Sequence, residues 1–230
     1  MNQDELKKQV GDEAVKYIQD GMIVGLGTGS TVSCLIDSLG EKIRQKHLHI
    51  TCVTTSKNTS KHAKEQNIKL IPLDDVDHID LTIDGADEIS ADFQGIKGGG
   101  GSLLWEKIVA NISDNYIWIV DESKMSNKIG EHFKLPVEVV PFGSKQLFRR
   151  FTKLGYKPTW RMDSKGEHRF HTDSDNYIID LHMGAIEHPH HLADSLIRTV
   201  GVIEQGLFLD RVNAVIVGHD SGPEYMQARP

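Results

Sequence analysis

A run of four glycines follows Lys97 and leads into a predicted helix that carries Glu106. Glycine reaches backbone conformations closed to other residues and has no side chain to keep a ligand away. Ordering four glycines loses more conformational entropy than ordering a common loop, so a purely structural turn is a poor explanation. A carboxylate and a loop rich in backbone N–H groups are the parts that proton abstraction next to a carbonyl requires. We therefore predict that Glu106 is a base and that the loop binds the oxyanion it creates.

The helix that must hold Glu106 is predicted from the spacing of its apolar residues. These residues are Leu104, Trp105, Ile108, Val109 and Ile112. Ser102 is the predicted N-cap, which puts Glu106 in the first turn. Unpaired N–H groups and the positive end of the helix dipole favour an ionised carboxylate there. The alternative is a flexible loop that caps a core helix, with Glu106 in solvent. Complementary residues elsewhere in the chain favour the catalytic interpretation.

A second glycine-rich turn follows a short predicted strand at residues 22–24. It contains Gly27, Thr28, Gly29, Ser30 and Thr31, and a helix begins directly after it. A strand, a glycine turn and a helix in this order aim backbone N–H groups at a phosphate. The spacing fits neither the dinucleotide fingerprint nor the nucleotide P-loop. Alone, the motif is explained equally well by a tight strand-to-helix connection.

An acidic cluster ends the predicted strand at residues 78–83. The cluster reads Asp84-Gly85-Ala86-Asp87-Glu88. Strands that alternate with helices predict a mostly parallel sheet, whose ligands bind beyond the carboxyl ends of the strands. A solvated Asp-Gly turn is the competing explanation. The glycine turn should open on the same edge, which favours a site. Lys124, beyond the strand at 116–120, is either a contact to an anionic ligand at this edge or a solvated loop lysine.

The remaining pattern predicts how the chain is divided. Further helices are expected at 4–20, 56–66, 144–153 and 189–199, and further strands at 50–54, 69–71, 160–162, 167–171, 177–181, 200–204 and 214–218. The change of pattern near Gly130 predicts a main domain of residues 1–130 and 207–230. Residues 131–206 are expected to form a small α+β domain, a lid or oligomer interface. The polar tail after His219 is expected to be loose.

Composition excludes several classes of protein. Of the 230 residues, 38% are hydrophobic and 26% charged, as in a globular domain with a core, and the net charge of −7 disfavours nucleic acid as a partner. Cys34 and Cys52 lack metal or redox spacing, and neither a signal peptide nor a membrane span is recognisable. We expect a cytoplasmic protein. Three histidines at 188–191 have no acid or cysteine spaced to join them, so no metal is expected there.

Together these motifs resemble those of the type A family of ribose-5-phosphate isomerases. The resemblance covers nearly the whole chain, including Lys7, Glu106-Lys107 and Leu135-Pro136-Val137-Glu138-Val139. It implies an α/β fold with a Rossmann-like, mostly parallel sheet flanked by helices, a small inserted α+β domain, and a homodimer. It also implies interconversion of D-ribose 5-phosphate and D-ribulose 5-phosphate in the non-oxidative pentose phosphate pathway, with no metal and no organic cofactor.

The resemblance also implies residue roles. Glu106 is the expected proton acceptor. Expected substrate contacts are Lys7, Thr28, Gly29, Ser30, Thr31, Asp84, Gly85, Ala86, Asp87, Lys97, Gly98, Gly99, Gly100 and Lys124. Asp84 is the candidate for moving the hydroxyl proton and Asp87 for opening the sugar ring, although these roles could be exchanged. The chain departs from the family pattern around Ser102 and Trp105, and again at residues 180–184.

Two other functions compete with this one. A non-catalytic sugar-phosphate sensor would keep the phosphate turn but would not need Glu106. A relative of amino-sugar-phosphate deaminases or lactonases would use a similar fold for a different reaction. Formation of ribulose 5-phosphate from ribose 5-phosphate would separate all three.

Overall fold

The computed structural model describes residues 1–46 and 48–229 and divides into two compact units. Unit 1 comprises Met1–Ala86, Trp105–Lys124 and Arg211–Pro230, and unit 2 comprises Asp87–Leu104 and Met125–Asp210. Residues 87–104, 125–130 and 207–210, which were predicted to belong to the main domain, group with unit 2. The reason is that short strands in these segments pair with one another.

Unit 1 is built on a six-stranded sheet in the order β14-β13-β6-β3-β1-β2. Its strands are β1 (Ile23–Leu26), β2 (Thr51–Thr54), β3 (Leu81–Asp84), β6 (Tyr116–Asp121), β13 (Ala214–His219) and β14 (Gly222–Gln227). All neighbouring pairs are parallel except β13 with β14. The predicted mostly parallel sheet is therefore confirmed.

The expectation of a loose tail after His219 is wrong. Residues Gly222–Gln227 form β14, which pairs in register with β13 from Ala214↔Gln227 to His219↔Gly222. Strand β14 lies at the edge of the sheet and its residues are exposed or half-buried, so it lacks the apolar run of a buried strand. Backbone pairing, which the side-chain pattern does not report, orders this segment.

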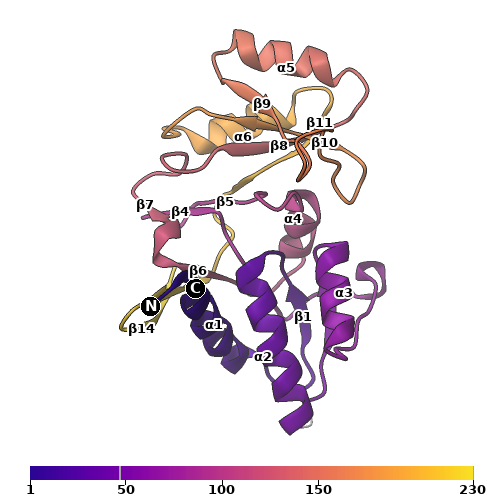
Figure 1. The fold of residues 1–230 in the computed structure, drawn as a ribbon, viewed down its shortest axis with the longest axis vertical. Helices are drawn as coiled ribbons and strands as arrows, with labels where there is room; N and C mark the ends of the chain where they lie inside the picture. Colours follow the sequence, from indigo (N-terminus) through magenta and orange to yellow (C-terminus); the bar gives the residue numbers. More distant parts are fainter. Residues whose placement is uncertain (47, 230) are drawn as a thin grey trace. The chain divides into compact units, whose positions relative to one another are not determined.

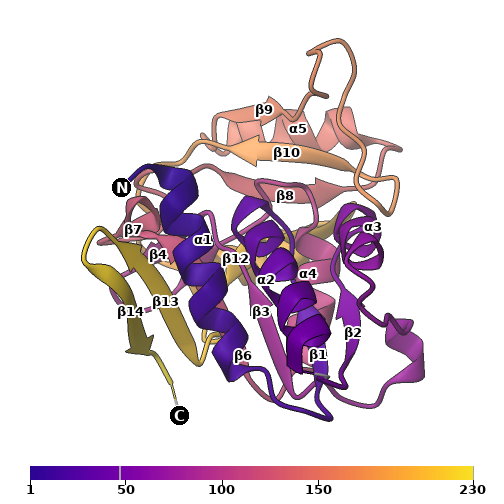
Figure 2. The same ribbon diagram turned by 60° about the horizontal axis from the view of Figure 1, so that its bottom comes forward.

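Helices cover both faces of this sheet. They are α1 (Gln3–Ala14), α2 (Ser30–Lys46), α3 (Lys57–Glu65) and α4 (Leu103–Asn111), with 3-10 turns at Val15–Tyr17, Leu73–Asp75 and Glu122–Lys124. Helices α1, α2 and α3 lie side by side (Figure 1), and α1 and α2 cross in front of the strands (Figure 2). Because side chains alternate along a strand, Cys52 packs in the cluster under α2 and Val53 packs with Val109 of α4 on the other face.

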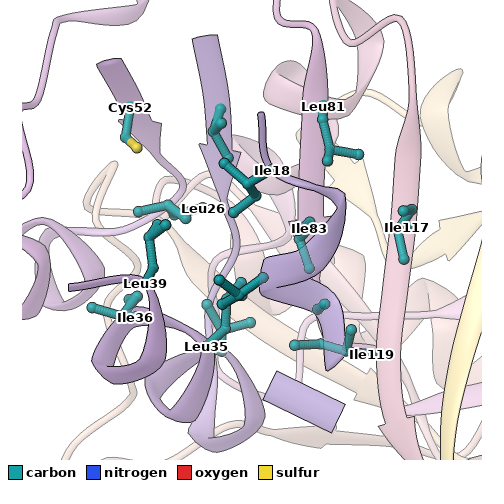
Figure 3. Packing of buried hydrophobic residues seen from close by; sticks show 14 of the residues in the cluster. Ile18, Leu26, Leu35, Ile36, Leu39, Cys52, Leu81, Ile83, Ile117 and Ile119 are labelled. Atoms are coloured by element: carbon teal, nitrogen blue, oxygen red, sulfur yellow. The ribbon is translucent and has the colours of Figure 1, made fainter. Parts of the chain in front are cut away.

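The main core of unit 1 lies between α2 and the strands. Leu35, Ile36 and Leu39 recur at helical spacing and are almost completely buried. Figure 3 shows them beside Leu26 of β1 and Ile83 of β3. This packing holds the carboxyl ends of β1 and β3 at fixed positions.

Unit 2 contains two four-stranded sheets. The first is antiparallel, in the order β11-β8-β10-β9, and its strands are β8 (Leu135–Val139), β9 (Pro158–Trp160), β10 (Tyr177–Leu181) and β11 (Val202–Gln205). The second has the order β12-β5-β4-β7, and its strands are β4 (Glu88–Ser90), β5 (Gly95–Ile96), β7 (Met125–Ser126) and β12 (Leu207–Phe208). Helices α5 (Ser144–Lys153) and α6 (Pro189–Ile197) contribute to the apolar core with Val137 and Ile179. The opposite face of the antiparallel sheet therefore carries Glu138 and Asp180.

Most predicted elements are confirmed to within a few residues, including α5 and β10. Two predicted strands are wrong. At 69–71 and 167–171 the described chain forms only isolated bridges, Cys52↔Leu70 and Met162↔Arg169. Across residues 1–46 and 48–229, none of the helices is both long and apolar enough to cross a membrane.

Candidate active site

Asp84, at the carboxyl end of β3, is held by the glycine turn that follows β1. Its Oδ1 accepts hydrogen bonds from the N–H groups of Thr28 (3.0 Å) and Gly85 (2.7 Å), and the carboxylate is completely buried. Gly27 lies against it, since a Cβ there would come within 2.0 Å of Oδ1. The glycine at this position is therefore explained by close approach to an acid, and the glycine turn and Asp84 form one structure.

Tyr116, at the start of β6, supplies the third hydrogen bond to Asp84. Its hydroxyl donates to Oδ2 at 3.1 Å. Burial raises the pKa of Tyr116 well above its usual range, and the charges of Asp84 and Glu106 raise it further. The tyrosine therefore stays protonated and remains a donor. Its position close to both carboxylates was not predicted, because the strand pattern indicates only that Tyr116 is buried.

Glu106 lies in the first turn of α4, which begins at Leu103 directly after Ser102. Only 4% of the residue is exposed, and its charge acts on Tyr116. The alternative of a solvated Glu106 is thus inconsistent with the structure. Unit 1 brings together a buried carboxyl, an acid fixed by three hydrogen bonds, and a glycine turn at the start of α2.

In the glycine turn that follows β1, Ser30 is exposed and Thr31 is half-buried. Behind it lies a group of hydroxyls, in which Thr28 Oγ1 is 2.8 Å from Thr55 Oγ1 and 3.3 Å from Thr59 Oγ1. Thr55 and Thr59 also donate to the carbonyl oxygens of Leu26 and Gly27, at 3.3 and 2.8 Å. These bonds fix the turn from beneath.

Two further lysines of unit 1 carry positive charge near the strand ends and the start of α2. Lys7 lies on α1, which packs against α2. Its charge partly opposes the rise that burial causes in the pKa of Cys34, a residue of α2. Lys124 acts on Asp121 at the end of β6. Burial alone would raise the pKa of Asp121, but hydrogen bonds from Ser123 and Gln3, together with Lys124, lower it.

Unit 2 holds the other predicted site residues. Gly99 donates its N–H to Asp87 Oδ2 at 2.6 Å, and only 2% of Lys97 is exposed. The Lys97 ammonium lies 5.5 Å from the centre of the Phe208 ring. Gly98 has φ +108, a conformation that other residues rarely adopt, so glycine is required there. Lys97, Asp87 and the glycine loop thus form a second ordered group.

Glu88 has a structural role. It is buried, and its carboxylate accepts hydrogen bonds from the N–H groups of Gly130 (2.7 Å), His132 (3.0 Å) and Phe133 (3.2 Å). Asp84 is also buried and Asp87 is half-buried. The acid cluster is therefore not a solvated turn, although only part of it is available for chemistry.

One group of potential metal ligands in unit 1 lies away from Asp84. His78, Asp80 and Asp114 each place a ligand atom within 4.8 Å of the others, near the start of β3, at the opposite end of the strand from Asp84. Of the three histidines at 188–191, His190 pairs with Asp210 at 2.7 Å on the surface. The group of His78, Asp80 and Asp114 is therefore not placed to take part in chemistry at Asp84.

Comparison with known proteins decides the family. The family model described as ribose 5-phosphate isomerase A (phosphoriboisomerase A) matches residues 51–222. The chain belongs to this family. The ribose-5-phosphate isomerases A of Limosilactobacillus reuteri and Levilactobacillus brevis are 61% and 57% identical to it, each over the full length of both chains. The resemblance drawn from the motifs is confirmed, and membership of this family makes the chain an isomerase.

Solved structures agree with this assignment. A D-ribose-5-phosphate isomerase in complex with phospho-erythronic acid superposes with a TM-score of 0.95 at 36% identity, covering 99% of this chain and 100% of that one. Ribose 5-phosphate isomerase A from Methanocaldococcus jannaschii gives a TM-score of 0.92 at 36% identity, covering 97% and 98%. The ribose-5-phosphate isomerase A fold therefore extends through both units.

Proposed function

We propose that this chain interconverts D-ribose 5-phosphate and D-ribulose 5-phosphate through a cis-enediolate, with Glu106 as the base. Moving the carbonyl from carbon 1 to carbon 2 requires that a proton leave carbon 2 and return to carbon 1. The observation that supports this role is the burial of Glu106 in the first turn of α4, within electrostatic reach of Tyr116, whose hydroxyl donates to Asp84. A carboxylate shielded from water is suited to take a weakly acidic proton.

The enediolate places negative charge on two sugar oxygens. The proposed hydrogen-bond donors to these oxygens are Lys97 and the N–H groups of Gly98 and Gly100. Loss of one such donor typically costs about 3 kcal/mol of transition-state stabilisation. The Gly99 N–H already donates to Asp87. We assign the hydroxyl proton shuttle to Asp84 and ring opening to Asp87, and these two roles are interchangeable.

The phosphate is proposed to bind at the turn after β1, through Ser30 and Thr31, with Lys7 and Lys124 adding positive charge. Backbone N–H groups at the start of α2 and the helix dipole favour an anion there. The structural neighbour that binds phospho-erythronic acid supports a site for a phosphorylated sugar acid in this family. Binding of the phosphate would position the reacting carbons.

The proposal is tested by a coupled assay of ribulose 5-phosphate formation from ribose 5-phosphate. Glu106→Gln should abolish most turnover and still bind phospho-erythronic acid nearly as tightly as the unmodified protein. Glu65→Gln, at an exposed position on α3, is the matched control and should keep full activity. Near-normal kcat in Glu106→Gln would show that the base is misassigned. Binding without conversion by the unmodified protein would indicate a sensor, and turnover of an amino-sugar phosphate or a sugar lactone instead would indicate a different enzyme.

We also propose that the protein acts in the cytoplasm as a homodimer, in the non-oxidative pentose phosphate pathway and without a cofactor. Light scattering coupled to size-exclusion chromatography measures the assembly directly. A mass of one chain at working concentrations would contradict the dimer.

A further inference from the structure

In unit 2, Arg161 joins the glycine loop to a buried acid. Its Nη1 donates to the carbonyl oxygens of Gly98 (2.9 Å) and Gly99 (2.7 Å). Its Nε donates to Asp180 Oδ2 at 2.8 Å, and its Nη2 donates to Oδ1 of the same carboxylate. The planar guanidinium thus binds a carboxylate through one edge and two peptide groups through another nitrogen, a geometry that lysine cannot reproduce.

The antiparallel sheet fixes Arg161 in this position. Its N–H donates to Ile178 of β10 at 3.0 Å, and its carbonyl accepts from Phe170 at 2.9 Å. Only 11% of the Arg161 side chain and 1% of the Asp180 side chain are exposed. Lys134 is a second cation at Asp180, 3.0 Å from Oδ2, so the buried carboxylate is paired even before Arg161 is counted.

The bonds from Arg161 determine the orientation of two peptide groups. In a planar trans peptide, the carbonyl and the following N–H point in opposite directions. Fixing the Gly98 carbonyl therefore turns the Gly99 N–H away from Arg161, and that N–H is the one that donates to Asp87. Fixing the Gly99 carbonyl likewise turns the Gly100 N–H away from Arg161. A positive charge at the two carbonyls also polarises both peptides and makes their N–H groups better donors.

A glycine loop without such support would sample many orientations, because glycine restricts the backbone least. Further contacts hold its ends. Lys97 N–H donates to Gly206 at 2.9 Å, and a Cβ at Gly101 would come within 2.4 Å of the Phe170 ring. Between these ends, Arg161 holds two successive carbonyls.

We propose that Arg161 is a positioning residue of the isomerase, aligned by Asp180, which orients the Gly99 N–H toward Asp87 and the Gly100 N–H for the enediolate step. This role rests on the proposed function, in which the Gly100 N–H stabilises the enediolate. Neither Arg161 nor Asp180 belongs to the motifs that identified the site.

The test compares Arg161→Ala and Arg161→Lys with Arg169→Ala. Arg169 is the matched control, since its guanidinium stacks 3.8 Å above the Trp160 ring in the same unit. We expect kcat to fall about tenfold to a hundredfold in both Arg161 variants, as for loss of an oxyanion donor, while KM changes less than about threefold. Methylguanidinium should restore part of the kcat of Arg161→Ala. Arg169→Ala should keep kcat within about twofold.

Amide hydrogen exchange provides a readout that does not depend on turnover. In Arg161→Lys, which keeps the charge, exchange at Gly99 and Gly100 should become faster while β8 and β10 stay protected. Unchanged exchange there, kcat within twofold of normal, or an equal loss in Arg169→Ala would each overturn the role of Arg161. If the unmodified protein does not form ribulose 5-phosphate, the proposed function fails, and exchange still reports whether Arg161 orders the loop.

Discussion

The hydroxyl of Tyr116 donates a hydrogen bond to Oδ2 of Asp84 across adjacent parallel strands of unit 1, at 3.1 Å. The two N–H bonds to Oδ1 fix the other oxygen, so the carboxylate plane has a single orientation. Because an acid that moves a proton must present a defined lone pair, this arrangement matters for Asp84 more than its burial alone.

Tyr116→Phe should lower kcat about tenfold to a hundredfold, because a hydrogen bond to a carboxylate contributes about 1.5–3 kcal/mol. The raised pKa of Tyr116 keeps the hydroxyl protonated, so the factor should be the same from about pH 6 to pH 9. Steady-state assays across this range measure it. Tyr225→Phe, which removes an exposed hydroxyl in the same unit, should have little effect. A ratio that varies strongly with pH would contradict the role of a permanent donor.

Gly27→Ala should displace Asp84 and lower kcat by about a hundredfold or more, with a loss of stability of about 1–3 kcal/mol. The added Cβ would come within 2.0 Å of Oδ1 and 2.6 Å of the Asp84 Cα, which a side-chain rotation cannot relieve. Glu41→Ala on α2 is the control, since the Glu41 side chain is exposed and alanine favours helix. Assays and urea unfolding should separate the two variants, and equal behaviour would refute the close-approach argument.

Thr31→Ala should raise KM about tenfold and leave kcat nearly unchanged, because a phosphate contact acts equally in the ground and transition states. Thr152→Ala, on the exposed side of α5, provides the control. An effect confined to kcat would mean that Thr31 does not contact the phosphate.

Glu138→Gln should stabilise the protein near neutral pH, because glutamine, like the protonated acid, places no charge at this buried position. Burial raises the pKa of Glu138 above its ordinary value of 4.5, although Asn176 and Thr172 donate to Oε1. A raised pKa in the folded state means that folding favours the protonated acid. The contribution of protonated Glu138 to the free energy of unfolding is present below about pH 4.5 and is lost as the pH rises through the folded-state pKa.

Urea unfolding at several pH values tests this prediction. The advantage of Glu138→Gln should shrink as the pH falls toward 4.5, and Glu167→Gln at an exposed site should show no such trend. A variant less stable than the unmodified protein at neutral pH would show that the charged carboxylate is stabilising.

Treatment with EDTA should leave isomerase activity unchanged, since Lys97 and backbone N–H groups are proposed to offset the enediolate charge. The measurement is the coupled assay before and after prolonged chelation and desalting. Loss of activity that Zn²⁺ restores would overturn the metal-free mechanism.

The fold was predictable where side-chain periodicity is strong. The apolar stripe of α5 and the apolar run of β6 mark their elements to within a residue or two. Periodicity fails for β14, whose order comes from backbone pairing with β13, and for 167–171, where one bridge replaces a strand. Main-chain hydrogen bonds leave no regular trace in residue types, so these segments could not be assigned from sequence.

The site was predictable as a set of motifs but not as a set of contacts. Residues such as Gly27 and Asp84 stand in short motifs whose types indicate chemistry. Arg161 is 63 residues from the carbonyl of Gly98 that it binds, and Tyr116 is 32 residues from Asp84. Residues 180–184 stood out in the sequence only as a departure from the family pattern, and nothing in the spacing of Asp180 pointed to the glycine loop.

The hydroxyls of Thr28, Thr55 and Thr59 lie beneath the glycine turn that follows β1, and each has one hydrogen to donate. Thr59 commits its single hydrogen to the carbonyl of Gly27, and the 2.8 Å contact between Thr28 and Thr55 uses one hydrogen of the two hydroxyls. A phosphate offers only acceptors, so Thr28 can donate to it and keep this contact only when Thr55 donates to Thr28 and gives up the carbonyl of Leu26. The exposed hydroxyl of Ser30 would therefore be the first to contact an incoming phosphate, while Thr28 supports the turn from beneath.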